Sequence, residues 1–185
     1  MEQTLTIDAK PRNREEPVWP EKLGELFDTH QARLYRLARR LSSDPEEARD
    51  LVQEAFLRAA RSPARVPDGA AAEPWLVRVV VNLCRDRRRR QRVRQRPLDE
   101  LVPPQPGNPE SAAVARATVQ AALARLSPRR RAVVALHELE GADVAEVARL
   151  LGISRVTVRW HLAAARRDLK QFLGVPDPAG ERREP

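Results

Sequence analysis

Basic and aromatic side chains share the outward face of one short segment near the C-terminal end of the chain. The apolar residues of this segment repeat at the spacing of a buried helical stripe: Val158, Leu162, Ala165 and Leu169. At about 100° per residue, the opposite face presents Val156, Arg159, Trp160, Ala163, Arg167 and Lys170. Guanidinium groups bind guanine edges or phosphates, and apolar groups contact thymine methyls. The face therefore predicts a helix that reads DNA; the alternative is an ordinary helical hairpin with a solvated basic face.

A second helix and a tight turn must position this reading helix, and the preceding residues have the required pattern. Apolar residues recur there at helical spacing: Val144, Val147, Ala148 and Leu151. Gly152 follows them, as glycine does where a chain leaves a helix with positive φ. Asp143 with Glu146 indicates the start of the first helix, and Ser154 can cap the second. Residues 143–170 are therefore predicted to form a helix-turn-helix.

A dense run of arginines ends another predicted helix, which begins at Pro74. Its members, relieved only by Asp86, are Arg85, Arg87, Arg88, Arg89, Arg90, Arg92, Arg94 and Arg96. So many guanidinium groups repel one another unless counterions or phosphates neutralise them. Phosphate binding releases condensed cations, so we expect an affinity for nucleic acid that falls steeply with salt. A solvated charge run is the alternative interpretation.

A compact polar and acidic patch lies on the predicted helix Pro45–Arg61. Asp50, Gln53 and Glu54 occupy positions i, i+3 and i+4, which share one helix face. The apolar stripe of this helix is Leu51, Val52, Ala55, Phe56 and Ala59. Spacing alone leaves two interpretations open, a solvated helix face and a docking surface for a basic partner.

No residue pattern supports catalysis. The chain has no Gly-rich phosphate loop, no nucleophile elbow and no paired carboxylates flanked by a histidine. His30, His137 and His161 are scattered, and the last is interpreted as a packing residue. The single cysteine, Cys84, fits a reducing compartment and excludes an internal disulfide framework. We expect no enzymatic activity, no metal site and no cofactor.

Composition points to an anionic partner. The 185 residues carry a formal net charge of +8, and nucleic acid is the commonest partner of so basic a chain. Aromatic residues make up 4%, which argues against single-strand binding through many stacked bases. No apolar run is long enough to span a membrane, and the N-terminus lacks a signal-peptide core. We therefore expect no membrane insertion and a cytoplasmic location.

Proline-rich segments interrupt the helical periods and divide the chain. The prediction is an all-α fold of two small helical domains joined by a Pro-rich linker, the C-terminal domain being a helix-turn-helix. The predicted boundaries are a disordered arm 1–20, a first domain 21–96, a linker 97–112, a second domain 113–173 and a tail 174–185.

Further helices are expected in both domains. In the first domain one helix runs from Glu21 up to Ser42, and a loop is expected over Ser62–Glu73. The helix from Pro74 is expected to bury one side, formed by Trp75, Leu76, Val79, Val80 and Leu83. In the second domain helices are expected over Glu110–Leu126 and Arg129–Glu140.

Three stretches carry a resemblance to a known family. DPEEARDLVQEAFLRAAR (44–61) and EPWLVRVVVNLCRD (73–86) resemble the second conserved region of bacterial RNA polymerase sigma factors. The segment 126–169, from LSPRRRAVV to AARRDL, is similar to their fourth region. Two domains and a short linker resemble the extracytoplasmic-function (ECF) group of the sigma-70 family. The run DLVQEAF is the more specific signal, since a helix-turn-helix alone occurs in many families.

The resemblance implies a role for each charged patch. Asp50, Gln53 and Glu54 match the helix that docks on the clamp helices of the large polymerase subunit. The loop 62–73 and the helix that follows match the part that melts the −10 element and holds an unstacked base. The implied −10 residues are Arg78, Asn82, Arg85, Arg87, Arg88 and Arg89. The implied −35 residues are Ser154, Arg155, Val156, Thr157, Arg159, Trp160 and Arg167.

The implied function is to direct core RNA polymerase to specific promoters and to help open the −10 element. Core polymerase, promoter DNA and an anti-sigma factor are the implied partners. The pair Trp160–His161 departs from the small or basic pair more usual in the family, so the −35 sequence does not follow by analogy.

Two other classes of protein are alternatives to a sigma factor. A LuxR-like helix-turn-helix regulator would bind DNA without docking on polymerase, but it would carry an α/β receiver or ligand-binding domain. The N-terminal half shows helical periods instead of alternating strands. An adaptor that binds RNA through the arginine run is the remaining alternative.

Overall fold

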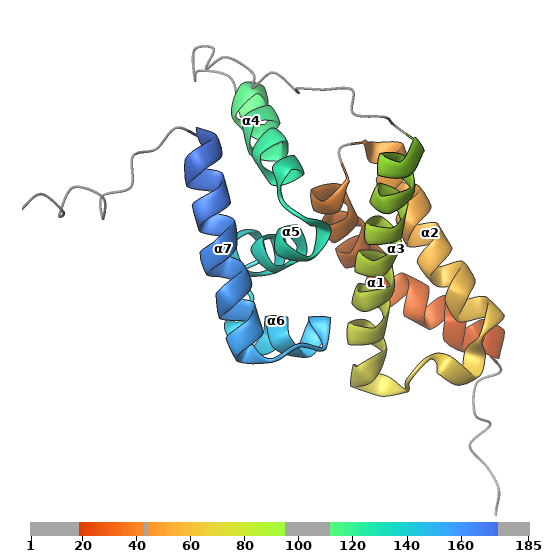
Figure 1. Ribbon diagram of the computed structural model, residues 1–185. Coiled ribbons are helices and arrows are strands. Elements are labelled where there is room, and N and C mark those ends of the chain that lie inside the picture. The colour runs from red at the N-terminus through yellow and green to blue at the C-terminus, as the bar shows by residue number, and fades with distance from the viewer. Residues whose placement is uncertain (1–18, 43, 95–111, 174–185) are drawn as a thin grey trace, which may run out of the picture.

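The computed structural model describes residues 19–42, 44–94 and 112–173, and within them every regular element is helical. The N-terminal half contains α1 (Trp19–Leu41), α2 (Pro45–Arg61) and α3 (Ala72–Arg94). The C-terminal half contains α4 (Ala112–Arg125), α5 (Pro128–Val134), α6 (Val144–Leu151) and α7 (Arg155–Leu173). Figure 1 shows the two groups side by side, with α3 facing the C-terminal half. The all-α fold class is confirmed.

Some predictions fall on segments about which the structure says nothing. Residues 1–18 of the predicted arm 1–20, residues 97–111 of the predicted linker 97–112, and the predicted tail 174–185 lie outside the described residues. The first helix begins at Trp19 instead of Glu21.

Side-chain caps start several helices where the sequence predicts them. The carboxylate of Asp44 accepts hydrogen bonds from the amides of Glu46 and Glu47, at 3.1 and 3.3 Å. Ser127 Oγ accepts from the amide of Arg130 at 3.4 Å. These caps satisfy amides that have no acceptor in the first helical turn. Pro45 and Pro128 follow their caps, since proline lacks an amide proton and its φ suits the first turn.

The predicted start of α3 and the predicted uniform helix 129–140 were wrong. α3 begins at Ala72, before Pro74, because proline is tolerated within the first turn of a helix. The preceding segment, predicted as a loop, contains two short 3-10 turns, η1 (Pro63–Arg65) and η2 (Gly69–Ala71). The predicted helix 129–140 is also not uniform. α5 passes into a π-helical turn, η3 (Ala135–Leu139), in which the Glu140 amide donates to the Ala135 carbonyl at 3.0 Å.

Helix α3 is buried on more than the one side that its sequence predicts. Its buried residues are Ala72, Pro74, Leu76, Val77, Val80, Val81 and Cys84, whereas Trp75, Val79 and Leu83 are half-buried. The reason is that α3 packs against α1 and α2 and also against α5 and α6. One apolar cluster therefore continues from Leu34 on α1 to Leu162 on α7.

Polar contacts also join the two halves. Arg88 on α3 donates to the carbonyls of Ala124 and Leu126 at 2.7 and 2.8 Å. Arg149 on α6 lies 3.4 Å from the Glu73 carboxylate, and Arg33 on α1 lies 3.5 Å from Glu140. We call this packing of the C-terminal half on the N-terminal half the closed arrangement.

Candidate docking site and nucleic-acid interface

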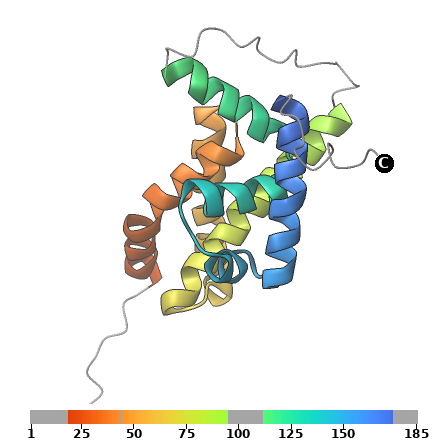
Figure 2. The same cartoon turned by 90° about the vertical axis from the view of Figure 1, so that its left-hand side faces the viewer.

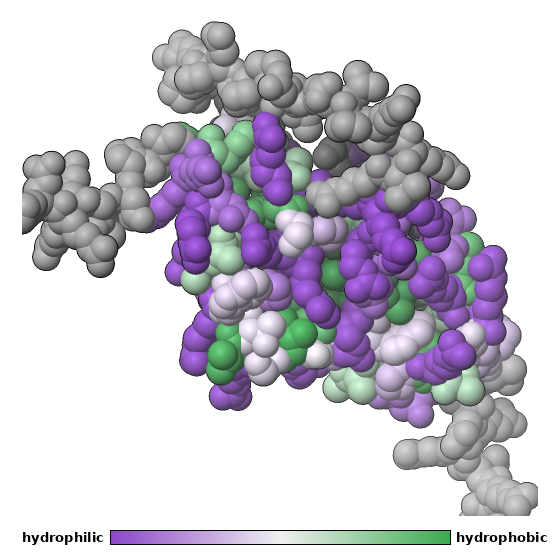
Figure 3. Space-filling view, in the orientation of Figure 1, coloured by the Kyte–Doolittle hydropathy of each residue, from purple (hydrophilic) through white to green (hydrophobic). Residues whose placement is uncertain are grey.

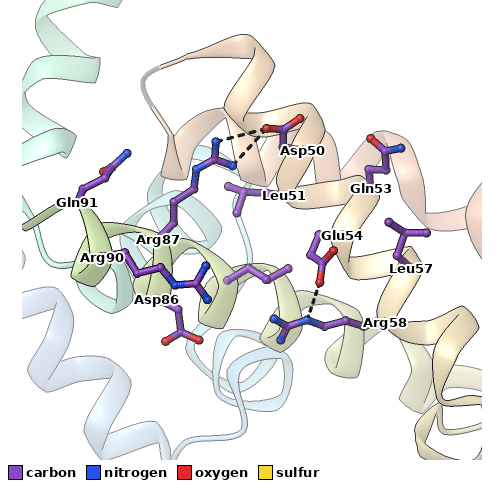
Figure 4. Close-up of a pocket in the computed structure, with 11 residues that line it drawn as sticks. Asp50, Leu51, Gln53, Glu54, Leu57, Arg58, Asp86, Arg87, Arg90 and Gln91 are labelled. Atoms are coloured by element: carbon purple, nitrogen blue, oxygen red, sulfur yellow. Dashed lines mark hydrogen bonds and ion pairs between the residues drawn. The ribbon is translucent and has the colours of Figure 1, made fainter. Parts of the chain in front are cut away.

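The predicted acidic patch borders a cleft between α2 and α3. The cleft has a volume of about 780 Å³, and Figure 4 shows residues of both helices around it. Asp50 and Gln53 are exposed, and Glu54 is half-buried. The residues of α3 that line the cleft are Leu83, Asp86, Arg87, Arg90 and Gln91. The structure thus brings the three predicted docking residues together at the edge of a groove whose walls carry both signs of charge.

Both carboxylates of this patch already have arginine partners. Asp50 Oδ2 accepts from Nη1 and Nη2 of Arg87, each at 3.3 Å, and Glu54 Oε1 accepts from Nε of Arg58 at 3.2 Å (Figure 4). Arg87 also lies 3.4 Å from Glu47. Because Asp50 and Arg87 are 58% and 41% exposed, solvent screens their ion pair and it holds weakly. A cationic partner can therefore displace Arg87 at small cost.

The six residues implied for the −10 element divide into three groups on α3. Arg78, Asn82, Arg85 and Arg89 follow one another at i, i+4, i+7 and i+11, so they form one stripe along the helix. Asn82, Arg85 and Arg89 are exposed, and Arg78 is half-buried. The structure brings these four together on one face.

Arg87 and Arg88 leave that face. Arg87 turns toward α2 and its carboxylates, as described above. Arg88 turns toward the end of α4, where unpaired carbonyls at a helix C-terminus attract a cation. In the closed arrangement neither guanidinium lies with the stripe.

The helix-turn-helix has the predicted turn and caps. Gly152 ends α6 with φ 64°, a left-handed conformation that favours glycine. Asp143 accepts from the Glu146 amide at 2.7 Å at the start of α6. Ser154 Oγ accepts from the Thr157 amide at 3.1 Å and lies 2.8 Å from Thr157 Oγ1. These local bonds fix the angle at which α7 leaves the turn.

The predicted reading face of α7 is exposed. Val158 and Leu162 are buried, while the side chains implied for the −35 element point outward; Val156 is 71% exposed and Trp160 58%. The remaining exposed members are Ser154, Arg155, Arg159 and Arg167, and Thr157 is half-buried. Figure 3 shows apolar and hydrophilic side chains mixed over α6 and the start of α7. This mixture suits base edges together with phosphates.

Trp160 is braced by neighbours that the sequence did not indicate. The Arg130 guanidinium lies 5.4 Å from the centre of the indole ring, and Asp168 holds Arg130 at 2.6 Å. His161 packs edge-on against Trp160 with ring centres 4.9 Å apart. Burial, followed by the charges of Arg129 and Arg130, lowers the pKa of His161. In the structure this ring packs against Trp160.

The main residue that sequence reasoning missed is Arg131. It lies in the predicted helix 129–140 without having been singled out there, yet it is 1% exposed and lies in the contact between the halves. Nη1 donates to the Leu41 carbonyl at 2.5 Å, and the thiol of Cys84 lies 3.5 Å from the same oxygen. Burial and then the charge of Arg88 lower the pKa of Arg131 to about 10. Burial likewise raises the pKa of the Cys84 thiol.

The described part of the chain contains neither a cluster of metal-ligating side chains nor a helix that could span a membrane. Within residues 19–42, 44–94 and 112–173, no three acidic, histidine or cysteine side chains gather as a metal site would require. No helix in these ranges is both long and apolar enough to cross a bilayer.

Two family models match the chain. Residues 26–94 match sigma-70 region 2, and residues 116–169 match sigma-70 region 4. The first match contains the α2–α3 cleft and the arginine stripe, and the second contains the helix-turn-helix.

Curated relatives extend the match over most of the chain. The ECF RNA polymerase sigma factor SigE of Mycolicibacterium smegmatis is 38% identical over 177 residues, covering 92% of this chain and 67% of that protein. SigM of Mycobacterium tuberculosis is 38% identical over 152 residues, covering 81% of this chain and 76% of that protein. SigL of the same species is 39% identical over 158 residues, covering 81% and 89%.

Solved structures share the fold. CnrH, in complex with the cytosolic domain of CnrY, has a TM-score of 0.56 and 25% identity, covering 85% of this chain and 91% of that chain. The sigma factor RpoE of Bartonella quintana, in complex with the anti-sigma factor NepR, has a TM-score of 0.56 at 21% identity, covering 86% and 98%.

The fold and the matched regions define the class. This chain belongs to the ECF group of the sigma-70 family of RNA polymerase sigma factors. As a sigma factor it directs RNA polymerase to promoters at the initiation of transcription. A LuxR-like regulator is not favoured, because the described N-terminal half is helical and matches sigma-70 region 2.

Proposed function

We propose that residues 21–96 and 113–173 act as two modules on one promoter, the first also docking on core RNA polymerase. Asp50, Gln53 and Glu54 are the proposed contacts to the clamp helices of the large polymerase subunit. The observation that carries the proposal is the row of these three residues on α2, two exposed and Glu54 half-buried, beside the arginine stripe of α3. An anionic dock and a cationic stripe on neighbouring helices allow one module to bind protein and DNA at once.

The stripe is proposed to serve the −10 element. Asn82 is exposed and carries an amide that can pair with a base edge. Arg85 and Arg89 lie farther along the same face, one and two turns beyond, where they can hold adjoining phosphates. Arg87 becomes available to the DNA when polymerase binds Asp50 in its place. Arg88 becomes available when α4 moves away from α3.

The exposed face of α7 is proposed to read the −35 element in the major groove. Arg155, Val156, Arg159 and Trp160 supply the mixture of charge and apolar surface, and Arg167 contacts phosphate. Arg130 and Asp168 keep the indole in place without entering the groove.

The two modules cannot bind one promoter at the same time while the protein is in the closed arrangement. Arg78 packs against the helix-turn-helix at Gly152, with its Cδ 3.2 Å from the position a Cβ would take there. Contact of Arg78 with the −10 element requires Arg78 and Gly152 to separate. Polymerase, by holding both modules, favours the open state and raises the effective concentration of each at its element. An anti-sigma factor that favours the closed state is the proposed antagonist, since the structurally similar RpoE was solved in complex with the anti-sigma factor NepR.

Charge reversal tests the dock. Asp50→Arg with Glu54→Arg should abolish co-purification with core polymerase, because two repulsive charges replace two attractive ones. Glu25→Arg with Asp28→Arg makes the same change in charge at exposed positions of α1 and serves as the control. Far-UV circular dichroism checks that both variants fold. If the first variant still associates with polymerase as the control does, the docking assignment is wrong.

Single-residue readout tests the −35 assignment. Arg159→Ala should cost about 1–3 kcal/mol of binding at one promoter position if its guanidinium is bidentate to a base. Binding of holoenzyme to a set of single-base −35 variants measures this. An equal loss on every sequence would mean that Arg159 contacts phosphate.

The whole proposal fails if run-off transcription with core polymerase shows no start sites gained on adding this chain. Retained RNA binding in the absence of any such start sites would instead support the RNA-binding adaptor.

A further inference from the structure

A second cleft, distinct from the docking site, lies between α1 and the C-terminal half. Its volume is about 640 Å³. α1 contributes Arg33, Tyr35, Arg36, Arg39 and Arg40, and the opposite wall is Ala117, Gln120, Leu139 and Glu140. In the view of Figure 2, α4 passes over one end of α1, and the two helices are in contact. None of these residues belongs to the proposed polymerase or promoter contacts.

The charge in this cleft is strongly unbalanced. Glu140 is the one carboxylate among its lining residues, and it lies 3.5 Å from Arg33, which also pairs with Glu73. Arg36, Arg39 and Arg40 have no hydrogen bond or ion pair within the described residues. They occupy positions i, i+3 and i+4, at which like charges repel.

One nitrogen of the half-buried Arg39 is also desolvated. Arg39 Nη1 is buried and donates to no acceptor in the described part of the chain. A buried donor without an acceptor is destabilising, and an arginine fork gains most from an oxyanion that accepts two of its N–H groups. The cleft therefore has a built preference for an anion with several oxygens.

Charge and size select the class of anion. A single phosphate group carries about −1.5 to −2, which leaves three guanidinium groups undercompensated. Two or three linked phosphates match them, and arginine forks suit phosphate oxygens geometrically. The volume lies within the range of small-molecule sites, about 300–1,000 Å³, and a duplex cannot enter it. The half-buried Tyr35 and the exposed Leu139 offer apolar surface beside the arginines, on which a base can lie.

The geometry points to a binding site for a small polyphosphate, free or as part of a nucleotide, held by Arg36, Arg39 and Arg40 in the cleft between α1 and α4. Because the walls come from both halves, the site is complete only in the closed arrangement. The bound anion therefore shifts the population toward that arrangement and away from promoter binding.

Calorimetric titration of the full-length protein tests the site. Sodium tripolyphosphate should bind saturably at moderate salt, and sodium sulfate at the same ionic strength should bind far more weakly. Arg36→Gln with Arg39→Gln should weaken tripolyphosphate binding by about tenfold or more, because two charge-assisted contacts are lost. Arg61→Gln with Arg129→Gln removes the same charge from exposed positions elsewhere and should change the affinity less than about twofold.

Two further measurements identify the source of the phosphates and the consequence of their binding. Tighter binding of ATP or GTP than of tripolyphosphate assigns the site to nucleotides, and equal affinity assigns it to the polyphosphate alone. Tripolyphosphate should also raise Tm of the parent and of the control pair, but not that of Arg36→Gln with Arg39→Gln. Three results would overturn the assignment. They are an equal loss of tripolyphosphate affinity in both double variants, no saturable binding of tripolyphosphate by the parent, and preferential displacement of tripolyphosphate by single-stranded RNA.

Discussion

Replacement of Arg131 by methionine should make the folded protein more stable. Arg131 is 1% exposed and forms no ion pair among the described residues, and the attraction of the Glu47 carboxylate offsets only part of the effect of burial on its pKa. Its Nη1 bonds the Leu41 carbonyl, while Nε and Nη2 are buried without acceptors in the described part of the chain. A buried charge without a directly paired counter-charge destabilises the state that buries it. Methionine has a similar unbranched stem that can fill the same space without the charge.

The size of the effect follows from the pKa of Arg131, which burial and Arg88 lower to about 10. Each pKa unit corresponds to about 1.4 kcal/mol, so the charged side chain costs the folded state roughly 3 kcal/mol. The lost bond to Leu41 offsets about 1 kcal/mol of the gain. We therefore expect Arg131→Met to raise the free energy of unfolding by about 2 kcal/mol, within the range seen when apolar residues replace buried ions. At about 2–4 °C per kcal/mol for a chain of this length, Tm should rise by about 4–8 °C.

Urea unfolding followed by circular dichroism measures this change, with Arg129→Met as the matched control. Arg129 is the exposed neighbour two positions earlier, and its replacement should change stability by less than about 0.5 kcal/mol. The folded state binds the Arg131 proton less tightly than the unfolded chain does. The Arg131 group therefore makes the parent more stable as pH rises through about 10. The difference in the free energy of unfolding between Arg131→Met and the parent should then become smaller. A variant that is less stable than the parent, or a difference that does not change with pH, would refute the reasoning.

Three other changes test particular contacts. Gly152→Ala should destabilise the protein by about 1–2 kcal/mol in thermal unfolding, because an L-residue is strained at φ 64° and its Cβ would crowd Arg78; an unchanged Tm would contradict this. Asp50→Asn and Arg87→Gln in a double-mutant cycle should show a coupling below about 1 kcal/mol, since both groups are well exposed; a larger value would mean that the pair holds α2 to α3. Burial and then Arg129 lower the pKa of His161, so the folded state binds its proton less tightly and the parent should lose stability as pH falls below about 6.5. His161→Gln should flatten that slope in urea unfolding between about pH 7 and pH 5, and an unchanged slope would assign it to other groups.

The helix starts were predictable because the interactions that create them are local. Asp44 and Asp143 bond amides two or three residues away, and Gly152 needs only its own φ. The exposed face of α7 was predictable for the same reason, since helical periodicity alone separates Val158 from Trp160. The π-helical turn η3 was not, because the pattern of 129–140 suits an ordinary helix equally well.

Motifs led to the proposed docking and promoter residues, but not to the contacts that these residues make in the structure. Arg87 and Arg88 look equivalent in the sequence, yet one pairs with α2 and the other with the end of α4. Neighbouring helical residues point about 100° apart, so which helix lies on each side decides their roles. A single sequence contains no information on that arrangement beyond the apolar stripes.

By itself the sequence determined the helices, their caps, the exposed basic face of α7 and the acidic row on α2, since each depends on residues at most a few positions apart. Only the tertiary structure decided that α3 is buried on more than one side, that Arg131 lies in the core and that four arginines of α1 share a cleft with α4. Those outcomes depend on contacts between residues far apart in the chain, such as the bond from Arg131 to Leu41, 90 positions away. The free energy of such contacts comes from surfaces brought together by folding, which no local pattern records.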